Sequence, residues 1–273
     1  MVESIKELRK ICGSKKKQPL YMELVSMKIS IYITKLLLYT KISADYVTIS
    51  MIILLIAGSV FMAFGDLWMI FIGILVIHFT IILDNVNGEV ARYRKEDGII
   101  GTFLEQVYHN IAVPLIFFTL SYGVFLKTGF YPILIFGFLA AVLGKPIVLD
   151  SIKDAVVTER LSEIKKSNKM QKIFVKGKLN IRGGGTKTGK RLYDIYDIVR
   201  EFWVYPANIV HITIFALIEL VNIQQGFFPQ YMLISLYLII YGVISTLIQI
   251  TAFIVNYKGK TAEHYYKELF ERK

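Results

Sequence analysis

The 273-residue chain has little cysteine and little charge. Its single cysteine, Cys12, excludes an internal disulfide framework and any cysteine-rich metal site. Only 19% of the residues are charged, against roughly 25% in soluble domains, and 55% are hydrophobic. This composition excludes a disordered chain, which needs low hydrophobicity, and argues against an ordinary soluble enzyme of this size.

Acidic residues are also few, because 21 Asp and Glu stand against 32 Lys and Arg, for a formal net charge of +11. A nucleic-acid-binding protein would explain the positive charge but not the apolar excess. A membrane protein with basic cytoplasmic loops explains both. The basic N-terminus is not closely followed by a short apolar core with a small-residue cleavage site, so we expect no cleaved signal peptide.

Six stretches are long and apolar enough for membrane spans, which need about 20 residues each. The segment before them, 21–41, is apolar but interrupted by charges, which favours a helix lying in the membrane interface, although Ile29, Ile31 and Ile33 alternate as in a strand. The sequence thus predicts an all-α integral membrane protein, with six transmembrane helices preceded by an interfacial N-terminal helix. The expected spans are roughly 44–64, 67–92, 100–126, 130–150, 193–222 and 228–256.

Lysine and arginine are distributed unevenly among the connections between these spans. Nine precede the first span, twelve lie in 151–191 and five follow Tyr257, whereas the connection between spans three and four has only Lys127. Since basic loops stay in the cytoplasm, we expect both termini there, with the basic loops contacting anionic membrane lipids and no nucleic acid. The expected parts are a basic segment with the interfacial helix (1–43), a six-helix transmembrane domain (44–256) containing a cytoplasmic loop (151–192), and a cytoplasmic tail (257–273).

The segment 184–190, GGTKTGK, nearly spells a phosphate-binding P-loop. Arg191 follows where Ser or Thr should bind magnesium, and no buried strand precedes the segment. We therefore interpret its glycines as turn residues.

Polar and small residues lie within the second and third predicted spans, between positions 84 and 109. On the second span they fall within one arc of roughly 140° of the helix surface, and on the third they recur every four residues. Because the spans are antiparallel and joined by a short loop, both sets should meet at one depth, just inside the cytoplasmic face. The residues are Asp84, Asn87, Gly88, Ala91 and Arg92 on the second span, and Gly101, Glu105 and His109 on the third.

The ionisable members of this set indicate a functional site. Such a group is costly when it faces lipid, so each should face a cavity or a partner. The carboxylates of Asp84 and Glu105, the Asn87 amide and the His109 imidazole suit Mg²⁺ or Mn²⁺ better than zinc. Arg92 supplies a bidentate clamp for phosphate. The alternative is structural pairing of Asp84 with Arg92 and of Glu105 with His109.

This stretch resembles the signature of the CDP-alcohol phosphotransferases, D-x(2)-D-G-x(2)-A-R-x(8)-G-x(3)-D-x(3)-D. Its spacing is kept throughout, and Thr48 stands where the family often has P-N-x-x-T. The matching residues are Asp84, Gly88, Ala91, Arg92 and Gly101. The departures are Asn87, Glu105 and His109, which replace the second, third and fourth Asp of the motif.

The resemblance implies a homodimeric membrane enzyme that moves a phospho-alcohol group from a CDP-linked donor to an acceptor hydroxyl and releases CMP. It implies that Asp84, Glu105 and, more weakly, Asn87 bind Mg²⁺ or Mn²⁺ on the cytoplasmic side. His109 would then be the base that deprotonates the acceptor. The residues expected to bind the cytidine diphosphate group are Thr48, Gly88, Ala91, Arg92 and Gly101.

Several alternatives stay open at this point. The acceptor is an alcohol, a lipid or a glycan, and either one or two metals fit a site that has lost negative charge at Asn87 and His109. The same fold also accommodates a different nucleotide-activated donor. A third hypothesis is a non-catalytic nucleotide- or metal-binding membrane protein or a transporter, although transporters usually place their polar site at the midplane of the membrane.

Overall fold

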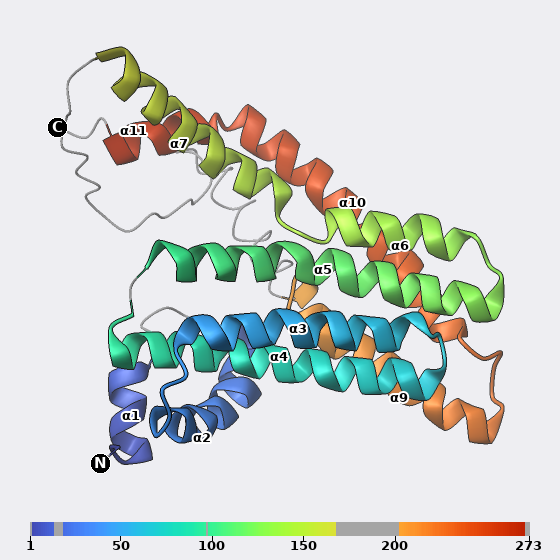
Figure 1. Cartoon of the computed structure of the whole chain (residues 1–273). Coiled ribbons are helices and arrows are strands. Elements are labelled where there is room, and N and C mark those ends of the chain that lie inside the picture. Colours follow the sequence, from blue (N-terminus) through green and yellow to red (C-terminus); the bar gives the residue numbers. More distant parts are fainter. Residues whose placement is uncertain (1, 14–18, 97, 168–201, 271–273) are drawn as a thin grey trace. The chain divides into compact units, whose positions relative to one another are not determined.

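The structure, a computed structural model, describes residues 2–13, 19–96, 98–167 and 202–270 (Figure 1). All regular elements of the described residues are helices. They are α1 (Ile5–Cys12), the π-helical turn η1 (Met22–Ser26), α2 (Met27–Leu38), α3 (Ala44–Ala63), α4 (Leu67–Arg94), α5 (Ile99–Thr128), α6 (Pro132–Leu143), α7 (Ile147–Ser167), α9 (Ala207–Gln225), α10 (Met232–Lys258) and α11 (Thr261–Phe270).

Six helical stretches of the described chain are long and apolar enough to cross a membrane. They confirm the predicted all-α class with six transmembrane helices after an N-terminal helical segment. The stretches are Ala44–Ala63, Leu67–Arg94, Ile99–Thr128, Pro132–Glu163, Ala207–Gln225 and Met232–Lys258.

Two of the predicted spans have different bounds in the structure. The fifth begins at Ala207 rather than 193, directly after Pro206, because a proline ring cannot continue a helix that precedes it. Residues 193–201 of that prediction, like the segment 184–190, lie outside the described residues. The fourth stretch is interrupted between α6 and α7 at residues 144–146, which include Pro146.

The described chain forms two units. The larger comprises Met1–Gly144 and Trp203–Val243, and it contains all the predicted site residues. The smaller comprises Lys145–Phe202 and Ile244–Lys273. Within the smaller unit α11 packs against α7, where the hydroxyl of Tyr266 donates to the carboxylate of Glu163.

The segment 21–41 is helical, as η1 followed by α2, and so does not follow its strand-like alternation. Three small hydroxyl residues spaced by four, the first at the end of η1 and the other two on α2, contact α4. Ser26 donates to the carbonyl of Ile81 at 3.1 Å, and Ser30 and Thr34 donate to the carboxylate of Glu89 at 2.7 and 2.5 Å. These bonds hold α2 beside the C-terminal half of α4.

Helices α3 and α4 cross with their backbones in close contact, because each contributes a glycine to the crossing. A Cβ atom on Gly73 would lie 2.5 Å from the carbonyl oxygen of Gly58 and 2.7 Å from the side chain of Met62. Glycines of this kind let membrane helices approach closely. The contact fixes α4, and with it the site residues on α4, against α3.

We expect Gly73→Ala to destabilise the larger unit by about 1 to 3 kcal/mol, the usual cost of overpacking, because the backbone of α3 cannot move away as a flexible side chain can. Thermal unfolding of the detergent-solubilised protein measures the effect. Gly98→Ala is the matched control, since no atom lies within 4 Å of a Cβ placed there. An unchanged melting temperature for Gly73→Ala would contradict the close crossing.

Candidate functional site

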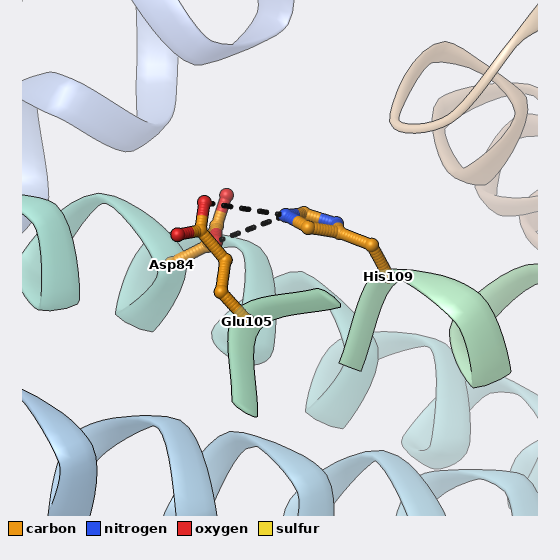
Figure 2. A group of neighbouring side chains, drawn as sticks. All are labelled: Asp84, Glu105 and His109. Atoms are coloured by element: carbon orange, nitrogen blue, oxygen red, sulfur yellow. Dashed lines mark ion pairs between the residues drawn. The ribbon is translucent and has the colours of Figure 1, made fainter. Parts of the chain in front are cut away.

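Three ligand-bearing side chains from two helices converge beside the C-terminal half of α4. Asp84 lies on α4, whereas Glu105 and His109 lie one turn apart on α5 (Figure 2). The Nε2 atom of His109 is 3.7 Å from Oδ1 of Asp84 and 3.8 Å from Oε1 of Glu105. All three candidate ligand atoms lie within 4.8 Å of one another. The predicted meeting of the two helix faces therefore holds for these residues.

The separation of these atoms suits a shared cation. Two ligands at 2.0–2.1 Å from one Mg²⁺ ion lie at most about 4.2 Å apart, so small side-chain rotations bring this trio into range. Two carboxylates and one imidazole also match the ligand preference of Mg²⁺ and Mn²⁺. The side chain of Asp84 is 16% exposed and that of Glu105 is 52% exposed. Asp84 thus lies deeper, and Glu105 lies at the open side.

A cavity of about 950 Å³ opens beside this cluster. Its lining includes most of the residues that the motif identified. These are Asp84, Asn87, Gly88, Ala91, Arg92, Gly101 and Glu105. Asn87 and the small residues of the motif therefore face the space in which a ligand would lie next to the carboxylates.

Thr48 is the predicted site residue that the structure places elsewhere. Its side chain is buried, and its hydroxyl donates to the carbonyl of Ala44 on its own helix at 3.3 Å. It is not among the described residues that line the cavity. A role for Thr48 in ligand binding stays a prediction, and its observed contact is within α3.

Arg92 lies in the last turn of α4, and its side chain folds back toward Gly88, one turn earlier. A Cβ atom on Gly88 would lie 3.0 Å from Nη1 of Arg92. The absence of a side chain at Gly88 therefore gives the guanidinium room beside the cavity. Nε of Arg92 donates to the backbone carbonyl of Cys12 in α1.

Two acidic residues of this region were missed in the sequence. Glu89 is buried and accepts hydrogen bonds from Ser30 and Thr34, and it also lines the cavity. Asp45 lies at the start of α3, close to Gly101 of α5. A Cβ atom added to Gly101 would lie 3.0 Å from Oδ1 of Asp45. The four-residue spacing of hydroxyls in 21–41 is the signal that would have indicated a polar partner such as Glu89.

No protein-family model and no curated protein sequence matches this chain. Solved structures do match. One is the phosphatidylinositol phosphate synthase of Mycobacterium tuberculosis with CDP-DAG bound, at 19% identity and a TM-score of 0.55, covering 84% of this chain and 93% of that one. The same enzyme in complex with manganese and citrate gives 18% identity and a TM-score of 0.50, covering 84% and 89%.

The chain has the fold of a CDP-alcohol phosphatidyltransferase. At these identities the likeness concerns the fold, and at that level it confirms the resemblance that the motif between Asp84 and His109 indicates. The described residues add a group of Asp, Glu and His side chains suited to a metal.

We expect the purified protein to bind Mn²⁺ and Asp84→Asn to weaken this binding by at least about tenfold, because even residues that only support a ligand contribute 10- to 100-fold. Titration followed by the electron paramagnetic resonance signal of free Mn²⁺ measures the affinity. Asp154→Asn removes an exposed carboxylate of α7 and should leave the affinity unchanged. Equal Mn²⁺ affinities for the two variants would show that Asp84 is not a metal ligand.

Proposed function

We propose that the chain is a metal-dependent membrane transferase that moves a phospho-alcohol group from a CDP-linked donor to an acceptor hydroxyl and releases CMP. The observation that carries the proposal is the convergence of Asp84, Glu105 and His109 beside a cavity lined by the remaining motif residues. The fold supports it, since it is shared with an enzyme whose structures contain CDP-DAG or manganese.

The donor would occupy the cavity with its diphosphate near Arg92. A guanidinium binds phosphate oxygens through two parallel hydrogen bonds, which fixes the orientation of the group. Gly88, Ala91 and Gly101 present little side-chain bulk to the same cavity, so a large nucleotide can approach the backbone of both helices.

Asp84 and Glu105 would hold Mg²⁺ or Mn²⁺, with the Asn87 carbonyl as a weaker ligand. When bound, the ion neutralises phosphate charge and polarises the phosphoryl group. Asp84 is largely buried, which keeps its carboxylate oriented, whereas Glu105 is more exposed and lies nearer the open side of the site.

In the reaction the acceptor oxygen forms a bond to the β-phosphorus of the donor. The bond between that phosphorus and the oxygen that CMP retains breaks, and CMP leaves with both electrons of the bond. The acceptor proton passes to His109, whose imidazole accepts a proton near neutral pH more readily than the carboxylate found at this motif position in the family. The acceptor would be a lipid, a polar alcohol or a glycan hydroxyl, as in the synthesis of phospholipids or related phosphodiesters.

The enzyme would act as a homodimer, with its site and both termini in the cytoplasm. The distribution of basic residues supports this orientation, because nine precede the first span and twelve lie in 151–191. Arg92 and Arg94, in the last turn of α4, lie at the same end of that helix as the site.

We expect the reconstituted protein to release CMP from CDP-diacylglycerol in the presence of Mg²⁺ and a mixture of alcohol acceptors. Asp84→Asn should reduce CMP release to background, whereas Asp154→Asn should retain it. The same assay with CMP- and UDP-linked compounds tests the donor. Full turnover by Asp84→Asn would refute the proposal. If only a UDP-linked compound were turned over, the donor would be UDP-linked and not CDP-linked.

His109 faces both carboxylates, so two roles fit its position, and they predict different results. If His109 is the base, His109→Gln should lower kcat by about 100-fold or more, the usual contribution of a general base, and leave the Mn²⁺ affinity unchanged. If His109 is a metal ligand, the same variant should weaken Mn²⁺ binding. We expect the first result, with His264→Gln as the matched control, because His264 is an exposed histidine of α11.

A further inference from the structure

Helix α1 is a short amphipathic helix of the larger unit that packs against α2 and α4, beside the C-terminal end of α4 (Figure 1). A capping box starts it, with Ser4 accepting from the backbone N–H of Glu7 and the Glu7 carboxylate accepting from that of Ser4. Leu8 and Cys12 are fully buried in a small apolar cluster with Ile31 of α2. Ile11 is 47% exposed, so α1 buries one face only.

The C-terminal end of α1 meets the last turn of α4. The final four carbonyls of a helix have no partner within the helix, and that end carries partial negative charge. The Cys12 carbonyl belongs to this group, and it accepts the hydrogen bond from Nε of Arg92. A second bond, from the Tyr93 hydroxyl to the Glu3 carboxylate at 2.6 Å, ties the start of α1 to the same turn of α4.

This contact fixes the direction of the Arg92 guanidinium. With Nε held by α1, the two Nη atoms lie over Gly88, which lines the cavity. Without the contact, the long Arg92 side chain would sample several rotamers, and ligand binding would have to order it. An arginine that is already oriented loses less entropy when it binds phosphate.

We propose that α1 is a positioning element of the ligand site, whose C-terminal carbonyl orients Arg92 toward the cavity, so that α1 docking and binding of the diphosphate group favour each other. This inference rests on the proposed function in one respect only, that Arg92 binds the diphosphate. The reciprocity follows because coupling between two binding events acts equally in both directions.

Cys12 provides a direct measure of α1 docking. It is the only cysteine of the chain, and its side chain is fully buried. Burial, assisted by the nearby charge of Glu89, raises the pKa of its thiol to about 11. The thiolate that reacts with maleimides is therefore scarce near neutral pH while α1 is docked, and undocking restores both exposure and reactivity.

The first experiment needs no ligand and measures the rate at which N-ethylmaleimide labels Cys12 in the full-length protein. Leu8→Asp, which places a charge in the buried face, should accelerate labelling by at least about tenfold. Arg92→Gln should also accelerate it by about tenfold or more, as expected for the loss of a hydrogen bond to a charged group. Ile11→Asp is the matched control on the exposed face of α1 and should label as slowly as the native chain.

Tyr93→Phe provides a milder test in case Leu8→Asp fails to fold. It removes only the hydroxyl that binds Glu3 and should accelerate labelling by about threefold. Labelling of Arg92→Gln at the native rate would overturn the proposal, because Arg92 and α1 would then not support each other. Rapid labelling of the native chain would overturn it as well.

The second experiment measures binding of CDP-diacylglycerol in the presence of Mn²⁺. Leu8→Asp should weaken this binding by about tenfold, with Mn²⁺ affinity unchanged, since Arg92, which α1 holds, lies about 12 Å along α4 from Asp84. In turnover, the same variant should raise KM for the donor while kcat changes by less than about twofold. The native chain should label more slowly with the donor bound, and equal rates with and without donor would overturn the coupling.

The two experiments separate this inference from the proposed function. If the native chain does not bind CDP-diacylglycerol, that donor and the coupling to it are both refuted, while the maleimide rates still decide whether α1 holds Arg92. If the donor binds equally to the native chain and to Leu8→Asp, the donor stands and the positioning role of α1 is refuted.

Discussion

A charged side chain inside an apolar helix needs a partner. Three such side chains in the last three turns of α4 determine which helices pack around α4. Asp84 meets His109 of α5, Glu89 meets the hydroxyls of α2, and Arg92 meets a carbonyl of α1. At 100° per residue, Glu89 points about 140° away from Asp84, so the two carboxylates cannot share a partner. Each of these three charges therefore engages a different helix, and all three residues line or adjoin the cavity.

The α3 side of the cavity depends on a second set of contacts. Arg94 donates to the carbonyls of Ile42 and Thr40 at 2.6 and 2.8 Å, and Glu96 accepts from the backbone N–H of Ala44 at 2.8 Å. The Glu96 bond satisfies the first backbone N–H of α3, one of the N–H groups that lack a partner within a helix, and the Arg94 bonds satisfy carbonyls of the connection between α2 and α3. Together with the glycine crossing further along, they fix α3 to α4 at both ends, so that the Asp84 region has a rigid frame.

The sequence was sufficient for the features that depend on composition and helical periodicity. The apolar runs predicted the spans, and steps of four residues predicted that Glu105 and His109 share a face that meets Asp84. The sequence was insufficient where a site residue contacts a backbone atom or a short helix that is distant in the chain. The Arg92 contact uses the Cys12 carbonyl, which any residue would supply, and the start of α9 depends on how the chain turns at Pro206. Glu89 was overlooked because its partners, Ser30 and Thr34, lie on α2, almost 60 residues earlier in the chain.

The replacements in the motif change the charge of the site, and this change bears on how many metals it holds. Asp84 and Glu105 supply two negative charges where the family motif supplies four, since Asn87 and a neutral His109 supply none. One divalent cation balances these two carboxylates, and Arg92 adds a positive charge that matches an incoming diphosphate. The other carboxylates that line the cavity include Glu89 and Glu96, which are engaged by the hydroxyls of Ser30 and Thr34 and by the backbone N–H of Ala44. The ligand cluster itself therefore balances one resident ion, and a second ion would need further oxygen ligands such as the phosphate oxygens of the donor.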